Sequence, residues 1–263
     1  CCSSDALQRQ KRRPSRRVSS MTKVLITPLT HAVLKNYNSI NNSLVVKKGN
    51  VVKTISNAEN IIGSAELDVE FPQDFAIYDL GKFLNAIELF RDRDHEAGLV
   101  FDNPNYVTIT SEPSRGRRIK YFFSDPAITM RVNPDREIKF PEHNINFTID
   151  EDSLESLRKA SRIFTLPDVT VNASQDSISL QARDRDDETT NVCDQVVRGS
   201  SDGEYQLDFK MDNLLVMGEY KEYNEDGELV VTSGDYDVEV SSRMISKWTH
   251  NSIPVQYFIA LEP

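Results

Sequence analysis

The chain has 263 residues, of which 38% are hydrophobic and 27% are charged, values typical of a soluble globular protein with one large domain or two of ordinary size. No apolar run approaches the roughly 20 residues of a membrane-spanning helix, and no stretch resembles a secretory h-region. The three cysteines, Cys1, Cys2 and Cys193, do not form a disulfide framework or a metal-ligand pattern, so we expect a reducing, intracellular compartment.

The first 20 residues differ in charge from the rest of the chain. They hold six basic residues and one acidic residue and lack periodic hydrophobicity. Such a basic run is compatible with a nucleic-acid arm, but we expect Met21 to be the native start and the leader to be upstream translated sequence or a remnant of expression. The remaining chain has 25 basic and 40 acidic residues, a formal charge of −15. This argues against a protein that coats DNA with its whole surface, but it allows an acidic body with one basic face.

One pattern, a short strand followed by a polar cap and a brief amphipathic helix, occurs four times. Two copies fill each half of the chain, so the halves read as one β-rich domain that has been duplicated. We therefore predict domains at 21–133 and 147–263, joined by a connector at 134–146 that carries two prolines. The four copies are 23–37, 75–87, 147–160 and 205–217.

In the first half, Thr27 followed by Pro28 predicts a helix start, because a capping hydroxyl precedes a proline at the first helical position. Ser43–Lys47 and Val51–Ile55 are predicted to form a hairpin, since they flank a Lys-Gly-Asn turn. A second helix is expected at Leu80–Phe90 from its helical apolar spacing. The remaining strands are predicted at Ile62–Val69, Leu99–Phe101, Tyr106–Thr110, Ile119–Phe123 and Ile128–Val132.

The second half repeats this plan. Its first helix is expected to open at Asp150 or Asp152, with Leu154 and Leu157 on the buried face, and another helix is expected from Asp212. Turn signals every 8–12 residues favour antiparallel sheets, so the predicted fold class is α+β. The strands are predicted at Val169–Ala173, Ser177–Ala182, Asn191–Val197, Tyr205–Lys210, Leu229–Thr232, Asp237–Ser241, Met244–Thr249 and Val255–Leu261.

The best candidate for a catalytic or metal site is the acidic run Asp184, Asp186, Asp187 and Glu188. It lies between two strands, is interleaved with arginines and lacks the ligand spacing and central glycine of a calcium loop, so we interpret it as a solvated turn. The four histidines are scattered, and no nucleophile elbow, Walker loop or dinucleotide fingerprint is present. The sequence therefore predicts neither an enzyme nor a bound metal or cofactor.

Basic residues gather on or beside the predicted helices. Arg158 and Arg162 are four residues apart and are expected to point away from the Leu154–Leu157 stripe. Each basic residue alone is typical of any solvated helix face. Together, in an acidic protein, they predict contact with the phosphate backbone without base readout. The predicted DNA-facing residues are Lys35, Lys82, Arg91, Arg158, Lys159, Arg162 and Lys221.

Several blocks of sequence, in this order and spacing, resemble the sliding clamps of T-even-type bacteriophages. They are 33–49, 75–84 and 257–262, with weaker similarity at 140–141, 157–162 and 234–236. The resemblance implies a DNA-clamp fold with two similar domains, antiparallel sheets outside and two short helices per domain on the inner face. It further implies a homotrimeric ring around duplex DNA that tethers a replicative polymerase in the cytoplasm of an infected bacterium, without a cofactor.

The resemblance also implies partner sites. A polymerase C-terminal peptide would enter an apolar pocket formed by Ile55, Phe140, Pro141, Leu261 and Pro263. Subunits would join edge to edge through Ile128, Met130 and Val132 of one copy and Val192 and Val196 of the next. A clamp loader and phage late-transcription factors are the other expected partners.

Three alternatives remain open from the sequence. A processivity factor that grips DNA with an open face would stay monomeric or dimeric in solution. A β-rich virion protein would explain the acidity and the strands but not the basic residues on helices. An enzyme would need an acidic constellation that converges in a cleft.

Overall fold

The computed structural model describes residues 22–91, 96–111, 116–129, 138–187, 189–224 and 226–263. In the first half, α1 begins where Thr27 Oγ1 accepts the amide of Thr30 at 3.1 Å, with Pro28 in the first turn. Asp79 caps α2 in the same way. The elements are β1 (Thr22–Leu25), α1 (Pro28–Ile40), β2 (Leu44–Val46), β3 (Gly49–Ile55), β4 (Ile61–Phe71), β5 (Phe75–Ile77), α2 (Leu80–Glu88), β6 (Ala97–Asn103), β7 (Tyr106–Ser111), β8 (Ile119–Phe122) and α3 (Pro126–Thr129).

In the second half, α4 is capped by Asp150, whose carboxylate accepts the amide of Ser153 at 2.8 Å. Hydrogen bonding to Ser153 lowers the pKa of the Asp150 carboxyl. The elements are β9 (Ile145–Ile149), α4 (Glu151–Phe164), β10 (Asp168–Ala173), β11 (Ile178–Arg183), β12 (Cys193–Ser201), β13 (Tyr205–Lys210), η1 (Met211–Asn213), β14 (Tyr220–Tyr223), β15 (Leu229–Thr232), β16 (Tyr236–Ser241), β17 (Ile245–His250) and β18 (Val255–Ala260).

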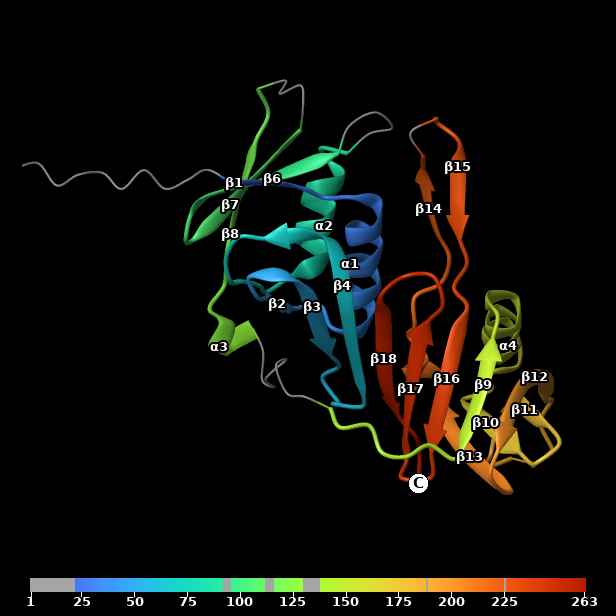
Figure 1. Cartoon of the computed structure of the whole chain (residues 1–263). Coiled ribbons are helices and arrows are strands. Elements are labelled where there is room, and N and C mark those ends of the chain that lie inside the picture. The colour runs from blue at the N-terminus through green and yellow to red at the C-terminus, as the bar shows by residue number, and fades with distance from the viewer. Residues whose placement is uncertain (1–21, 92–95, 112–115, 130–137, 188, 225) are drawn as a thin grey trace, which may run out of the picture.

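One antiparallel sheet of ten strands runs through both halves, in the order β13-β10-β11-β12-β9-β16-β17-β18-β4-β3. The junction is β18 with β4, registered from Val255 opposite Ala65 to Ile259 opposite Ile61. Figure 1 shows this junction in the middle of the molecule. A second sheet, β1-β6-β7-β8, completes the first half. The predicted α+β class with antiparallel sheets is confirmed.

The helices pack on the sheets through apolar stripes. On α1, Val33, Leu34 and Tyr37 are buried against β3 and β4. Gly63 on β4 allows this close packing, because a Cβ there would lie 3.0 Å from the Tyr37 ring. Leu154 and Leu157 bury α4 against β11 and β12. Each fully buried aliphatic side chain stabilises the fold by about 1.5–3 kcal/mol.

The predicted fourth helix, from Asp212, is wrong. Only the three-residue 3-10 turn η1 forms at Met211–Asn213, and the chain then runs without regular structure to β14. No side chain caps η1. The described part of the second half therefore has one helix of more than one turn, α4.

The reason is that side chains of other elements bind the carbonyls that a helix would use. Arg158 donates to the oxygens of Leu214 and Val216, and Asn36 Nδ2 donates to the oxygen of Leu215 at 2.9 Å. The hydroxyl of Tyr236 donates to the oxygen of Met217 at 2.7 Å. Four consecutive carbonyls from 214 to 217 are thus satisfied by tertiary contacts, so they are not available for the hydrogen bonds of a helix.

The predicted hairpin pairing and the predicted strand at Ile128 are also wrong. The 43–47 and 51–55 strands do not pair with each other, because β2 pairs with β5 and β3 pairs with β4. The turn itself is well placed: Gly49 has φ +119, and Asp74 accepts the amide of Lys48 at 2.8 Å. Ile128 lies in α3 and not in a strand, while Met130 and Val132 fall outside the described residues.

Candidate nucleic-acid interface

Helices α1 and α2 lie side by side in the first half, and α4 lies on the second half (Figure 1). Each packs its apolar stripe on a sheet and turns its polar face away. The predicted basic residues must therefore be judged by what each side chain touches on that polar face.

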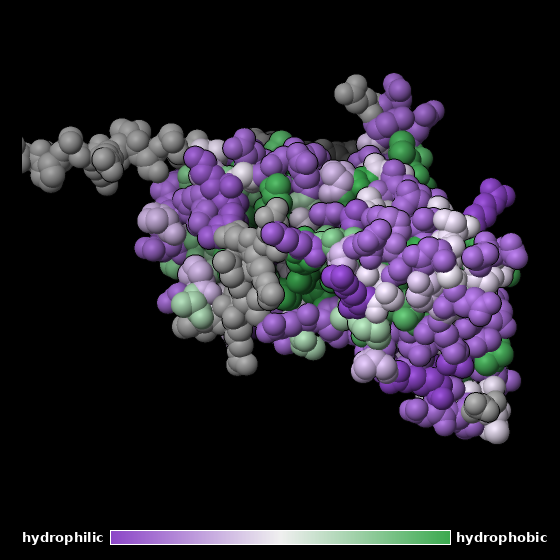
Figure 2. All heavy atoms as spheres, turned by 60° about the horizontal axis from the view of Figure 1, so that its bottom comes forward, coloured by the Kyte–Doolittle hydropathy of each residue, from purple (hydrophilic) through white to green (hydrophobic). Residues whose placement is uncertain are grey.

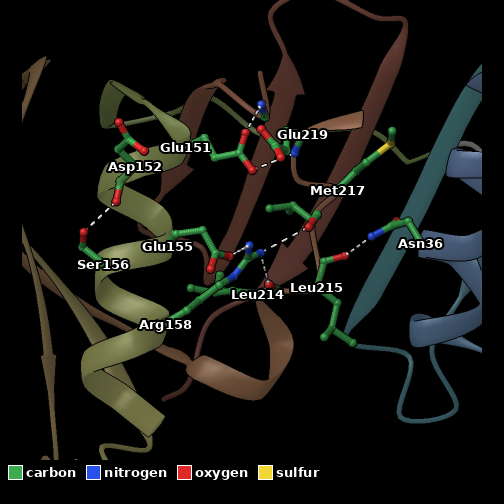
Figure 3. Close-up of polar contacts among 12 residues, drawn as sticks. Asn36, Glu151, Asp152, Glu155, Ser156, Arg158, Leu214, Leu215, Met217 and Glu219 are labelled. Atoms are coloured by element: carbon green, nitrogen blue, oxygen red, sulfur yellow. Dashed lines mark hydrogen bonds and ion pairs between the residues drawn. The ribbon is translucent and has the colours of Figure 1, made fainter. Parts of the chain in front are cut away.

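Arg158 is not available to a ligand. Its side chain is only 20% exposed, its Nη1 lies 2.9 Å from Glu155 Oε1, and its Nη2 donates to the oxygens of Leu214 at 2.8 Å and Val216 at 3.2 Å. Figure 3 shows the guanidinium turned from α4 toward the 214–217 segment. Arg158 therefore fixes the segment that replaces the expected helix, whereas the sequence predicted that it faces DNA.

Lys159 and Arg162 are the exposed cations of α4. The Arg162 side chain is 68% exposed and lies 3.6 Å from Glu155 Oε2, a separation that leaves its guanidinium largely solvated. Lys159 is exposed as well. These two residues can approach a phosphate without losing a buried contact.

On the first half, Lys35 of α1 is exposed and Lys82 of α2 is 80% exposed. Lys82 Nζ lies 2.9 Å from Asp79 Oδ2, the carboxylate that also caps α2. The hydrogen bond from the Lys82 amide and then that from its side chain lower the pKa of Asp79, while the same side-chain contact raises the pKa of Lys82. Lys82 is therefore a cation already paired at the surface.

A cavity of about 400 Å³ lies between α1 and residues 217–221, and three predicted cations line it: Lys35, Arg91 and Lys221. Lys221 Nζ lies 2.8 Å from Glu219 Oε1. His31 is also in the wall, with Nε2 2.9 Å from Glu88 Oε1. Burial, and then the neighbouring Arg91, lower the pKa of His31 from 6.5 to about 4, so its ring is neutral at physiological pH.

The predicted partner pocket is only partly assembled. Ile55, Ile62 and Phe258 are neighbours across β3, β4 and β18, on the sheet face opposite Gly63 and α1. The Phe140 ring lies 6.0 Å from the Phe258 ring, so these four side chains form an apolar row in which Ile55 is buried and the other three are half-buried. We call it the outer apolar row. Pro141 follows Phe140 and is half-buried.

Leu261 and Pro263 lie elsewhere. Leu261 is 6% exposed in the core, with its amide donating to the oxygen of Met244, and the Pro263 oxygen accepts from Arg185 Nη1 at 3.2 Å. The sequence analysis did not predict that Ile62 and Phe258 belong to this row. The available signal was the alternation of apolar residues in the two strands that carry them, β4 and β18. Figure 2 shows hydrophobic side chains in a hollow between the halves when the bottom of Figure 1 is turned forward.

Two of the open strand edges in the described part of the chain are candidates for a contact between copies. β8 is the last strand of its sheet, and Cys193–Val197 of β12 pairs with β11 alone, because β9 joins β12 only at Arg198–Ser201. Exposed apolar side chains lie close to both edges. Near β8 they are Leu89 at the end of α2 and Phe122, and on the β12 side they are Ile163, Phe164, Val192 and Val196.

The described residues of the acidic run bond within their own turn. The amide of Asp186 bonds to Asp184 Oδ1 and that of Thr189 to Asp187 Oδ1, both within an exposed turn, while Glu188 lies outside the described residues. Across the described ranges, no three His, Cys, Asp or Glu side chains are grouped as metal ligands, and no helix is long and apolar enough to cross a membrane.

Comparison with known proteins gives a consistent result. Residues 27–102 match the family described as DNA polymerase processivity factor. The sliding clamp of Vibrio phage KVP40 is 27% identical over 238 residues, covering 89% of this chain and 96% of the relative. The sliding clamp of Enterobacteria phage T4 is 26% identical, covering 73% of this chain and 83% of the relative. The resemblance to T-even-type phage clamps is confirmed.

Solved structures show the same fold at low identity. The Entamoeba histolytica proliferating cellular nuclear antigen matches with a TM-score of 0.66 and 10% identity, covering 93% of this chain and all of that chain. The PCNA of A. fulgidus, solved with the C-terminal region of FEN-1, matches with a TM-score of 0.66 and 12% identity, covering 92% of this chain and 98% of that chain. The fold is the two-domain clamp fold.

Proposed function

We propose that this chain, whose sequence is similar to those of phage sliding clamps and which has the clamp fold, is a DNA polymerase processivity factor that encircles duplex DNA and keeps a replicative polymerase on its template. The observation that carries the proposal is the sheet that continues through both halves, with α1, α2 and α4 packed on it and exposed cations on their polar faces. No catalytic step belongs to this function. The virion-protein alternative is not favoured.

DNA contact rests on the exposed cations rather than on all the predicted ones. Lys35, Lys159 and Arg162 are exposed. Lys82 and Lys221 are also exposed, but each is held by a close carboxylate, Asp79 and Glu219 respectively. Arg91 is half-buried in the wall of the cavity. Against a body of charge −15, such a face attracts phosphate while the rest of the surface repels it. Weak, screened contacts suffice, because a ring is held on DNA by its closure.

The two candidate edges support assembly into a ring. A contact between β8 of one copy and Cys193–Val197 of β12 in the next is head-to-tail. Repeated head-to-tail contacts either close into a ring or continue as a filament. The contact would cover Leu89 and Phe122 against Ile163, Phe164 and Val196, and backbone pairing would extend the sheet. We assign the first edge to β8 in place of the 128–132 segment, and we expect three copies per ring.

Partner docking is assigned to the outer apolar row of Ile55, Ile62, Phe140 and Phe258. A polymerase tail with apolar side chains could anchor there, because a few buried apolar residues carry most of the free energy of a small interface. A clamp loader, late-transcription factors and a site of action in the host cytoplasm remain expectations from the resemblance.

The test is retention on circular DNA. The assembled protein is loaded on nicked circular DNA with a phage loader, and retention is measured before and after the circle is cut. Release on cutting is expected, whereas equal retention on linear DNA would point to a protein that grips an open face.

A charge test accompanies it. Lys159→Glu with Arg162→Glu should weaken primer extension on long templates and reduce the slope of affinity against salt by about 0.9 for each phosphate that is no longer neutralised. The matched control is Arg198→Glu with Arg243→Glu, two exposed cations outside the described helices. An equal effect of both pairs would show that net charge, and not the helix face, governs DNA binding.

A further inference from the structure

A third group of exposed apolar side chains belongs to neither the subunit edges nor the docking row. It lies on the two-stranded ribbon β14–β15, where Leu229 is 51%, Val230 40% and Val231 48% exposed. β14 and β15 pair with each other, from Tyr220 opposite Thr232 to Tyr223 opposite Leu229. Neither strand joins another sheet within the described ranges. Exposed β-branched strands of this kind readily accept another strand.

Hydrogen bonds from α4 fix the base of the ribbon. The Glu151 carboxylate accepts the amide of Glu219, just before β14, at 2.7 Å and the amide of Gly234, just after β15, at 2.8 Å. The two backbones cross there, since a Cβ on Gly234 would lie 2.8 Å from the Cα of Gly218. Figure 3 shows Glu151 reaching from α4 toward Glu219. One carboxylate therefore fixes both ends of the ribbon, so its exposed face is held in a defined position.

The ribbon also lies away from the docking row. Figure 1 shows β14 and β15 projecting at the top of the molecule, whereas the chain end and the segment after residue 137 lie at the bottom. β14 lies next to α1, so the free edge is that of β15. A molecule bound to β15 would thus sit on the opposite end of the protein from the docking row.

Charge decides which molecule fits this edge. The exposed or half-exposed acids of the ribbon are Glu219, Glu222, Asp226 and Glu228, and they face a single base, Lys221, which is already paired with Glu219. A second copy would bring an equally acidic ribbon alongside, and like charges opposed across strands are destabilising. A strand that alternates apolar and basic side chains would match both the apolar face and the acids.

We propose that the free edge of β15 binds an extended, apolar and basic segment of another protein by strand addition. The backbone of the segment pairs with β15, and its apolar side chains cover Leu229 and Val231 on one face. Its basic side chains lie on the other face, beside Val230, and reach toward Glu228 and toward Glu222, which is opposite Val230 on β14. The site adds a second partner surface, and it is independent of ring closure and of the docking row.

The probe is a short fluorescent peptide that alternates Val and Lys, titrated by anisotropy against the assembled protein. Leu229→Asp with Val231→Asp should weaken binding by at least about tenfold, and Glu222→Lys with Glu228→Lys should do the same. The matched control, Leu25→Asp with Val51→Asp, changes two apolar residues of similar exposure on other strands and should bind like the wild type. A peptide N-methylated at alternate residues should bind poorly, because it cannot pair along the strand.

Equal binding to the ribbon variants and the control would overturn the proposal. So would unchanged binding of the N-methylated peptide, or equal binding of a peptide that alternates Val and Glu. If the probe fails to bind and light scattering instead shows two assemblies joined through contacts that Leu229→Asp with Val231→Asp removes, the occupant is a second copy and the proposal is wrong. Retention on circular DNA should be normal in Leu229→Asp with Val231→Asp, which changes no basic or acidic residue, so the outcome is separable from the clamp function.

Discussion

Replacing Arg158 by alanine should destabilise the protein while leaving its affinity for DNA nearly unchanged. The guanidinium donates to the oxygens of Leu214 and Val216 and pairs with Glu155. Leu214 and Val216 are only 2% and 4% exposed, so water cannot easily replace the missing donor. The alanine variant leaves two shielded carbonyls without their charged partner.

The size of the destabilisation follows from the hydrogen bonds of Arg158. Both carbonyls accept from the same atom, Nη2, at 2.8 Å and 3.2 Å. We therefore count them as one charged hydrogen bond, which contributes about 1.5–3 kcal/mol. The pair with Glu155, with side-chain exposures of 20% and 33%, adds less than about 1 kcal/mol after screening. The free energy of unfolding should fall by about 2–4 kcal/mol, which corresponds to a decrease in Tm on the order of 10 °C.

Urea and thermal unfolding at fixed protein concentration measure this destabilisation, with DNA binding measured in parallel. Arg162→Ala is the matched control, because it lies on the same helix near the same Glu155 but is 68% exposed. It should cost less than about 0.5 kcal/mol of stability and should weaken DNA binding. The reverse pattern, with Arg158→Ala stable but deficient in DNA binding, would refute the assignment of Arg158 as a structural residue.

Three further predictions concern the other surfaces. Phe122→Asp and Val196→Asp should each give monomers in sedimentation, since each places a carboxylate at a proposed edge; a normal assembly in both would exclude these edges. Ile62→Asp with Phe258→Asp should abolish binding of a polymerase C-terminal peptide by calorimetry without changing the assembly, and unaltered affinity would place docking elsewhere. The pKa of His31 is about 4 in the folded protein and 6.5 unfolded, so the unfolded chain binds the proton first and stability should fall as pH drops between these values. His31→Gln should flatten that part of the stability profile, and an unchanged profile would assign the acid sensitivity to other groups.

The features that the sequence predicted well are local. Thr27, Asp79 and Asp150 each cap a helix whose apolar residues recur at helical spacing. The capping residue and the apolar spacing both lie within one or two turns of the same helix. The strand alternation of β16, β17 and β18 is equally local, because each buries one face. These elements needed no knowledge of distant contacts.

Most of the failures depend on partners far along the chain. The 212–217 segment has apolar residues suited to a helix, but Arg158, Asn36 and Tyr236 bind its carbonyls from other elements. The turn at Gly49 was predicted correctly, but β2 pairs with β5 and not with β3. Residue patterns alone could not select β5 as the partner of β2. For the site, spacing on α4 could not separate Arg158 from Arg162, because the difference lies in acceptors more than 50 residues away.

The pairing of β18 with β4 has a mechanical consequence. Five registered residue pairs join the halves in one continuous sheet, reinforced by the Tyr257 hydroxyl bound to Asn36 across the junction. A force that separates the halves must break this ladder and also divide the one hydrophobic core that both halves share. The proposed contact at β8 is a single strand of four residues. We therefore expect each chain to move as a stiff arc during loading, with the gate for DNA at a seam between copies.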